Sequence, residues 1–598
     1  MASDYYQDFI KEAFIDSIRS VLIIDDDYPT FDEVLSNQHD LNSGSQIEKE
    51  KNWYENPERI REVIRKFRSN KPPLLVDIHD GRNVATEAEN TIAGHLYQSD
   101  LLVLDYQLDK SRKGDGTRAI EILRYLMSND HLNLVIVYTN EDLDTVFDSV
   151  RLGLLGPSKA SLSEEEMETA ENLIDDADEK KTDFRSHIYQ SIDTEQYLHS
   201  RLNEQTYLGT MMRGGKLYSH FNKLTEDAGW KPEERKLVLR YILGQFEKSQ
   251  LDVMNTISPE DAFRWSTNST KWIKGESIFI CFSNKSDDDD LLSELQKALN
   301  DWQPNPSRLF LAKLRASMDE YGVVAQAQAL TDKYALAYWY KRLLQASESA
   351  REWYVAESVS RHSDQLMGTI LQRVGDFAKN LIEAEAAAGD IDQTCQARFN
   401  VDLTKEDNKK KAFREHNAYV CSRKPEGSHL TTGQIFTLYD EYWICLSPAC
   451  DMVPSQMSPW KTNMFGERLP FIAVRLRPIK KKWPEDINTN RYLFFQVDDG
   501  VQVFCFNDPD PSKVSSLPHW STFYAEDAGR FGDDFRFKVW RTEEEKDGEH
   551  GAGRRETNLV IKHHDVKVVS QLRDEYAINL MQKLGVSLTR VGLDFSGG

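Results

Sequence analysis

The chain has 598 residues, 74 of them basic and 98 acidic, which gives a formal net charge of -24 at pH 7. A chain of this length divides into several domains, because single hydrophobic cores stop growing well below this size. The acidic balance disfavours general affinity for nucleic acids or anionic membranes. Six cysteines are too few for a disulfide framework, and no apolar run is long enough to cross a bilayer, so we expect a soluble, cytoplasmic protein.

The first 149 residues alternate short apolar runs with helical segments. Four runs have the length and composition of buried strands: residues 21–24, 74–76, 101–104 and 134–139. Between them lie segments of helical character: residues 56–67, 85–97 and 117–127. This alternation predicts a doubly wound parallel sheet with helices on both faces.

Polar side chains stand at the carboxyl ends of three of these runs. Asp25 and Asp26 directly follow the first run, Asp105 ends the third, and Thr139 ends the fourth. Functional groups of parallel sheets collect at the carboxyl ends of the strands, so we expect these side chains to meet. Converging carboxylates suit a hard divalent cation such as Mg²⁺. With such an ion bound, one carboxylate can act as a nucleophile toward a phosphoryl group.

The order of these motifs resembles that of the receiver domain of bacterial response regulators: VLIIDD at 21–26, LLVLDYQL at 101–108, GDG at 114–116 and VIVYT at 135–139. The resemblance implies that Asp105 accepts a phosphoryl group from a histidine kinase. It implies Asp26 as a direct Mg²⁺ ligand and Asp25 as a water-mediated one. Gln107 would contribute its backbone carbonyl to the ion, and Thr139 would hydrogen-bond the phosphoryl group.

A receiver also carries a lysine at the end of its fifth strand. The usual spacing from Thr139 points to Lys159, but the surrounding LGPSKAS reads as a loop. A better strand is IFICF at 278–282, which is followed by Lys285 and then by a helical segment. We therefore favour Lys285 and a receiver that is split by an insertion. Ser286 stands where a proline usually follows the lysine, so Lys159 stays open as the alternative.

These observations predict a multidomain chain of class α/β + α + β. The expected parts are a receiver-like domain (1–149), a helical insertion (150–274), the last receiver strand and helix (275–302), a helical bundle (303–392) and a β-rich C-terminal domain (393–598). Within the insertion, Ser163 and Glu166 fit a capping box, and Pro232 lies near a helix start.

A short seam of apolar residues lies in the predicted bundle. Its members alternate steps of three and four, as in a coiled coil: Met367, Ile370, Val374, Phe377 and Leu381. Packing inside the bundle and a homodimer interface both fit this pattern, and five positions do not decide between them.

From about residue 400, aromatic and β-branched runs separated by turns predict a small barrel that closes with a helix. Four residues in this part lack the spacing of a zinc site and fit buried structural positions better: Cys421, His429, Cys445 and Cys450. Cys450 with His563 or His564 is a candidate nucleophile and base. The lysines of PIKKKWP, at 478–484, fit a solvated hairpin tip better than a nucleic-acid contact.

The leading hypothesis is a signalling protein in which phosphorylation of Asp105 controls a C-terminal output. The arrangement resembles the response receiver proteins of two-component-like bacterial operons, some of them linked to anti-phage defence. One alternative is an enzyme with its chemistry in the C-terminal domain and the receiver as its switch. A phosphohydrolase is disfavoured, because Gln107 occupies the place of its general-acid aspartate. A scaffold that is never phosphorylated would have no reason to bind Mg²⁺.

Overall fold

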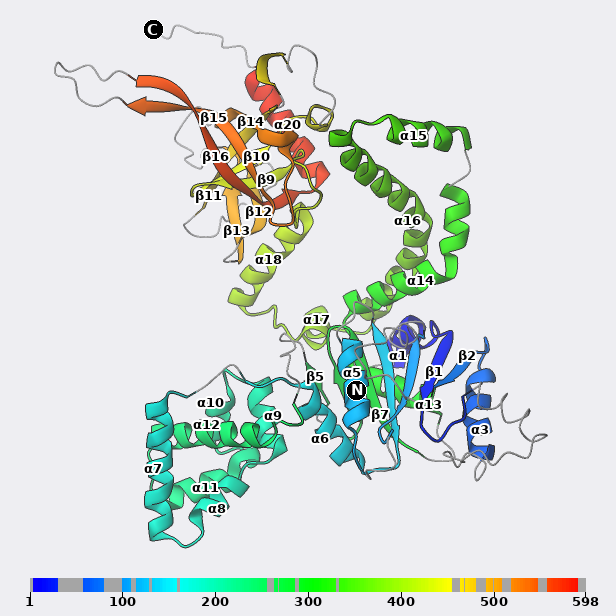
Figure 1. Cartoon of the computed structure of the whole chain (residues 1–598), viewed down its shortest axis with the longest axis vertical. Coiled ribbons are helices and arrows are strands. Elements are labelled where there is room, and N and C mark those ends of the chain that lie inside the picture. Colours follow the sequence, from blue (N-terminus) through cyan, green and yellow to red (C-terminus); the bar gives the residue numbers. More distant parts are fainter. Residues whose placement is uncertain are drawn as a thin grey trace, which may run out of the picture. The chain divides into compact units, whose positions relative to one another are not determined.

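The computed structural model of the chain divides into two compact units, residues 1–316 and 317–598 (Figure 1). It describes residues 4–30, 57–79, 99–108, 114–127, 132–158, 162–254, 263–266, 268–285, 290–329, 333–453, 463–466, 468–479, 491–497, 500–507, 518–546 and 557–589. Among these residues, no helix combines the length and the apolar character that a bilayer crossing requires. The helix expected at 85–97 and the lysines at 480–482 lie outside the described residues.

The first unit is built on a sheet with the strand order β2-β1-β3-β4-β7-β6-β5. The five strands from β2 to β7 pair in parallel, and β6 and β5 extend the sheet in antiparallel fashion. The strands are β1 (Ser20–Ile24), β2 (Leu75–His79), β3 (Leu101–Asp105), β4 (Asn133–Thr139), β5 (Arg264–Trp265), β6 (Trp272–Lys274) and β7 (Ile278–Asn284). The parallel part has the 2-1-3-4-5 order of a common doubly wound fold, with β7 in the fifth place, and this confirms the predicted sheet.

Helices cover both faces of this sheet. Successive side chains of a strand point to opposite faces. Phe282 of β7 packs edge-on against Phe147, and Phe279 of the same strand packs against Trp302. Phe147 and Trp302 belong to different helices, so each face of β7 has a helix over it. The helices around the sheet are α1 (Asp4–Ile10) with the π-helical turn η1 (Lys11–Ile15), α3 (Pro57–Arg68), α5 (Thr117–Met127), α6 (Leu143–Leu154) and α13 (Leu291–Trp302).

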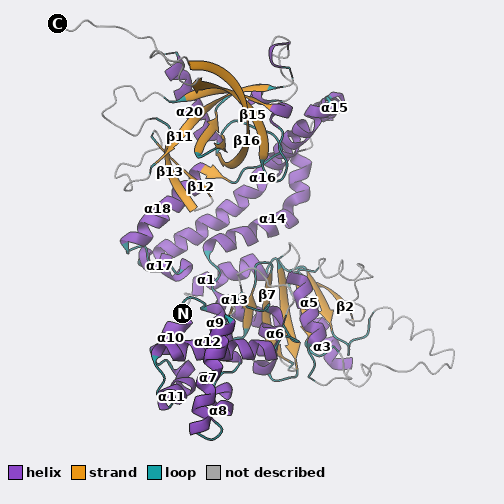
Figure 2. Ribbon diagram, turned by 60° about the vertical axis from the view of Figure 1, so that its left-hand side comes forward, coloured by secondary structure: helices purple, strands orange, loops and turns teal. Residues whose placement is uncertain are grey.

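All the described secondary-structure elements between α6 and β5 are helices, as Figure 2 shows. Its elements are α7 (Glu164–Lys180), α8 (Phe184–Gln190), α9 (Thr194–Leu202), α10 (Tyr207–Met212), the 3-10 turn η2 (Lys216–Tyr218), α11 (Ser219–Asp227) and α12 (Pro232–Ser249). The predicted capping box is confirmed: Ser163 Oγ accepts from the Glu166 backbone at 3.2 Å, and the Glu166 carboxylate accepts from the Ser163 backbone at 2.9 Å. Pro232 is the first residue of α12, also as predicted.

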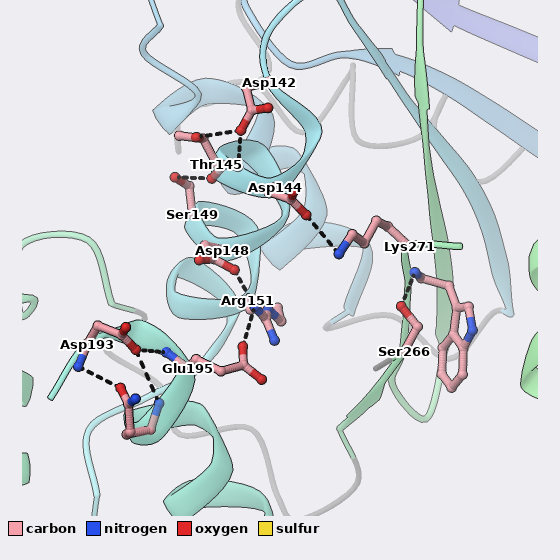
Figure 3. Close-up of polar contacts among 12 residues, drawn as sticks. Asp142, Asp144, Thr145, Asp148, Ser149, Arg151, Asp193, Glu195, Ser266 and Lys271 are labelled. Atoms are coloured by element: carbon pink, nitrogen blue, oxygen red, sulfur yellow. Dashed lines mark hydrogen bonds and ion pairs between the residues drawn. The ribbon is translucent and has the colours of Figure 1, made fainter. Parts of the chain in front are cut away.

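Arg151 of α6 ties the helical segment to the sheet (Figure 3). Its side chain is only 5% exposed and forms ion pairs with Asp148 in the same helix and, at 3.4 Å, with Glu195 of α9. The guanidinium also lies over the ring of Trp265 in β5, 5.6 Å from its centroid. A single buried cation therefore contacts the sheet edge and the first turn of α9.

The second unit begins with long helices. The helices of this region are α14 (Pro306–Ala329), which starts in the first unit, α15 (Lys333–Gln345), α16 (Glu348–Ala387), α17 (Ile391–Phe399) and α18 (Glu406–Cys421). Trp339 of α15 donates to the Ser358 hydroxyl of α16 at 2.8 Å, which holds these two helices together. In the predicted seam of α16, Ile370, Phe377 and Leu381 are buried within the chain, as packing inside a bundle requires.

Six strands of the C-terminal part close into a barrel. They pair in the order β10-β9-β16-β15-β14-β11, and β11 pairs back onto β10. The strands are β8 (Ser422–Arg423), β9 (Gln434–Leu438), β10 (Glu441–Cys445), β11 (Leu469–Pro478), β12 (Tyr492–Val497), β13 (Gly500–Cys505), β14 (Trp520–Ala525), β15 (Arg536–Lys546) and β16 (Thr557–Leu572). Phe436, Phe471 and Phe523 pack on one another inside the barrel. The predicted small barrel is confirmed, and α20 (Asp574–Leu588) is its closing helix.

Candidate functional site

Three carboxylates meet at the carboxyl edge of the parallel sheet. Asp25 and Asp26 directly follow β1, and Asp105 is the last residue of the neighbouring β3. One carboxylate oxygen from each of the three lies within 4.8 Å of the others. Asp25 is 3% exposed and Asp105 is 7% exposed, so two of the three charges are almost completely removed from solvent. Among the described residues, this is the one group of three acidic, histidine or cysteine side chains close enough to hold a metal ion.

The ammonium of Lys285 lies between two of these carboxylates. Its Nζ is 2.9 Å from Asp25 Oδ2 and 2.8 Å from Asp105 Oδ2, and the side chain is 6% exposed. Lys285 comes directly after β7, and its backbone N–H donates to the carbonyl of Thr139 at 2.7 Å. The insertion therefore interrupts the sequence but not the sheet edge. Lys159, the alternative lysine, lies outside the described residues.

The electrostatics of the cluster follow from its burial. Burial raises the pKa of Asp105 to about 7; the nearby Lys285 opposes this rise and the charge of Asp25 adds to it. Burial alone would lower the pKa of Lys285, but the two carboxylates together raise it above its ordinary value. The cluster therefore favours the charged form of Lys285, whereas burial favours the neutral form of Asp105.

Thr139 and Gln107 stand beside the acidic group. Thr139 ends β4 and is 1% exposed, and its hydroxyl accepts from the backbone N–H of Glu141 at 3.1 Å. The backbone N–H of Gln107 donates to Asp105 Oδ1 at 3.3 Å. The Thr139 hydroxyl accepts the bond from Glu141 through its oxygen, and among the described residues its hydrogen has no acceptor. Both residues thus lie where the sequence places them, at the ends of adjacent strands.

The GDG motif has a packing role that the sequence did not reveal. A Cβ atom added to Gly116 would lie 2.0 Å from the ring of Tyr106, the residue after Asp105. Only glycine leaves room for this ring, which is 5% exposed. Gly116 therefore fixes the path of the chain directly behind Asp105.

The donor set fits a hard divalent cation. It consists of carboxylate oxygens, and such ligands suit Mg²⁺ better than a softer transition metal. Burial raises the pKa of Asp105 by more than the nearby Lys285 lowers it. A further positive charge next to Asp25, Asp26 and Asp105 would stabilise the ionised form.

The cysteines considered as functional residues of the C-terminal domain lie in different surroundings. Cys421 and Cys445 are buried, and the Cys421 thiol donates to the carbonyl of Phe494 at 2.7 Å. Cys450 is exposed, with its sulfur 3.9 Å from a carboxylate oxygen of the adjacent Asp451.

The imidazole of His564 instead contacts the Tyr439 hydroxyl at 3.0 Å and the Glu543 carboxylate at 2.9 Å. The four residues weighed for zinc do not form a metal-binding group in the described part of the chain.

Residues 17–191 match the family model of the response receiver domain. The matched segment contains Asp25, Asp26, Asp105 and Thr139, and it ends just after α8, so that β7 and Lys285 lie beyond it. No curated protein and no solved structure matches the chain. The first unit therefore carries a receiver domain, and β7, the last of its parallel strands, lies beyond the matched residues.

Proposed function

We propose that this receiver domain is a phosphoacceptor: Asp105 takes a phosphoryl group from a histidine kinase or a related phosphodonor protein, and this modification controls the second unit. The observation that carries the proposal is the buried bridge from Lys285 to both Asp25 and Asp105, at 2.9 and 2.8 Å. Burying a cation between two carboxylates at a strand end costs desolvation free energy, so such a cluster often indicates a functional site. Stabilising a transferred phosphoryl group is a function that fits this arrangement.

The transfer uses the ionised form of Asp105. A carboxylate oxygen attacks the phosphorus atom of the donor, and a P–O bond forms while the bond to the leaving group breaks. The leaving group departs with the electron pair and takes up a proton. Lys285 neutralises part of the charge on the phosphoryl oxygens, and the Thr139 hydroxyl donates a hydrogen bond to one of them.

Asp25, Asp26, Asp105 and the backbone carbonyl of Gln107 are the groups that would hold Mg²⁺. The proximity of the three carboxylates within 4.8 Å supports this assignment. When bound, the ion neutralises the negative charge that gathers between the carboxylates and the phosphoryl oxygens.

We place this signalling role in the cytoplasm, because six cysteines in 598 residues are too few for a disulfide framework. The resemblance to response receivers of defence operons extends the proposal to anti-phage signalling. Survival of phage-challenged cells that carry the wild-type chain or Asp105→Asn tests that extension. Equal survival of the two strains would contradict it.

The direct test of the phosphoacceptor role is intact-mass measurement after treatment with acetyl phosphate and Mg²⁺. The wild-type chain should gain one phosphoryl group, and Asp105→Asn should gain none. Asp144→Asn is a matched control, because the Asp144 side chain lies in the same unit and is 76% exposed. It should be phosphorylated like the wild type. Replacement of Mg²⁺ by EDTA should abolish the gain in every protein. A wild type that binds no Mg²⁺ and gains no mass, with a histidine kinase as donor as well, would favour the scaffold.

A further inference from the structure

The helical segment contains a cavity of about 330 Å³ that opens to the surface, and this volume is in the size range of small-molecule sites. It lies among α7, α9, α10 and α12, away from the acidic cluster of the sheet edge. Its apolar and aromatic lining comes from Leu162, Met167, Tyr197, Tyr207, Tyr241 and Leu243. Three tyrosines around one cavity form a surface that suits a planar ring.

The carboxylate of Glu247, on the cavity wall, is already satisfied by the protein. It accepts from the Tyr197 hydroxyl at 2.6 Å, from the Ser158 backbone N–H at 3.0 Å and from Arg201 at 3.3 Å. Burial raises the pKa of Tyr197 above its ordinary value, so this hydroxyl keeps its proton and stays a donor. Glu247 therefore does not need a cationic ligand.

The cationic side chains at the cavity keep unused donors. Arg201 makes its contacts with Tyr197 and Glu247 through Nη1, and Arg240 contacts Glu166 through Nη1 at 3.2 Å. In the part of the chain that the structure describes, the remaining guanidinium N–H groups have no hydrogen-bond partner. Lys248 has no ion-pair partner there either. These donors match a phosphate or carboxylate group.

A glycine forms part of the cavity lining. Gly244 lines it from the middle of α12, a place where glycine weakens a helix relative to alanine. A Cβ atom built on Gly244 meets no atom within 4 Å, so any longer side chain would project into empty space. Because Gly244 is exposed, a bulky side chain at this position would stand at the cavity lining without disturbing the packing of α12.

The cavity is also connected to the sheet. Ser158, whose N–H donates to Glu247, follows α6, and α9 is held to α6 by the Arg151–Glu195 ion pair (Figure 3). The helix that follows Thr139 thus supports one wall of the cavity. We propose that the cavity is a binding site for a small aromatic anion, with its ring among the tyrosines and its phosphate or carboxylate group at Arg201, Arg240 and Lys248. This site is separate from the phosphoacceptor and does not depend on it.

Ligand-observed NMR on the full chain tests this proposal, with phenyl phosphate as the probe and EDTA present so that no metal holds the anion at the acidic cluster. Phenyl phosphate should bind about tenfold more tightly than phenol or inorganic phosphate, because only the first has both ring and charge. Gly244→Leu adds a bulky side chain to the cavity lining and should weaken binding at least about tenfold. Gly375→Leu, at another helical glycine with open space around it, should leave binding unchanged.

Arg240→Gln provides a second variant that leaves the cavity open. It should weaken phenyl phosphate about tenfold and leave phenol unchanged. Thermal melting of each variant shows that it is folded. Unchanged binding to a folded Gly244→Leu, or no signal from the wild type at about 10 mM phenyl phosphate, would overturn the proposal.

Discussion

Replacing Asp105 with asparagine should stabilise the metal-free first unit, and the gain should grow with pH. The side chain is 7% exposed, and burial raises its pKa to about 7 from an ordinary value of 3.8. The folded protein therefore favours the neutral acid. The stability that this neutral form provides is present below the unfolded-state pKa, and it is lost as the pH rises through the folded-state pKa. Asparagine is neutral and of similar shape throughout this range.

The magnitude follows from the size of the pKa difference. One unit of pKa corresponds to about 1.4 kcal/mol, so full ionisation of Asp105 costs the folded state about 4 kcal/mol. Part of this cost is already present at about pH 5.5, because Asp105 is ionised in the unfolded chain at that pH. Between about pH 5.5 and about pH 8, the wild type should lose about 2 kcal/mol relative to Asp105→Asn.

Hydrogen exchange followed by mass spectrometry measures this difference within one unit of the full chain. The relevant peptides cover β3 and β4, which are central in the sheet. Comparison of wild type and variant at the same pH, in EDTA, cancels the intrinsic pH dependence of exchange. A stability difference that stays constant from about pH 5.5 to about pH 8 would refute the reasoning, because Asp105 would then be ionised throughout.

Three further predictions concern the stability contributed by Lys285, Gly116 and Arg151. Lys285→Met leaves two buried carboxylates without their cation and should lower the metal-free stability by about 3 kcal/mol. Mg²⁺ should add more stability to this variant than to the wild type. An unchanged midpoint of urea unfolding would contradict the prediction. Gly116→Ala places a Cβ atom against the ring of Tyr106 and should lower the free energy of unfolding by about 2 kcal/mol, as measured by thermal melting. An unchanged melting temperature would show that the ring moves aside freely. Arg151→Met should lower the free energy of unfolding by about 3 kcal/mol and speed hydrogen exchange in α9. Arg185 is the control: its side chain is 40% exposed, and Arg185→Met should lower the free energy of unfolding by less than about 1 kcal/mol. Equal losses in the two variants would contradict a linking role for Arg151.

The sheet and its polar edge could be predicted because each strand carries its own signal. The runs before Asp25, Asp105 and Thr139 are short and apolar, and the rule that parallel strands share one functional edge brings their ends together. The same reasoning finds β7, because IFICF followed by Lys285 is a better strand than the stretch around Lys159. The structure then gives this strand a parallel partner in β4.

Other features depend on contacts that leave no local pattern. β5 and β6 have two and three residues, too few to show an alternation of apolar and polar positions. Arg151 and Glu195 lie 44 residues apart, and nothing in either segment indicates the pairing. The barrel closes through pairing of β10 with β11, and the intervening segment gives no sign of that register. In the sequence, Gly244 indicates only a position of low helix propensity, and nothing there indicates the cavity beside it.

The central claim is that Asp105 itself carries the phosphoryl group. Reduction with borohydride after incubation with acetyl phosphate and Mg²⁺ converts an aspartyl phosphate to homoserine, and peptide mass spectrometry then locates the residue. Our account predicts homoserine at position 105 and at no other aspartate of the chain. Homoserine at a different position, or none with either acetyl phosphate or a histidine kinase as donor, would contradict it.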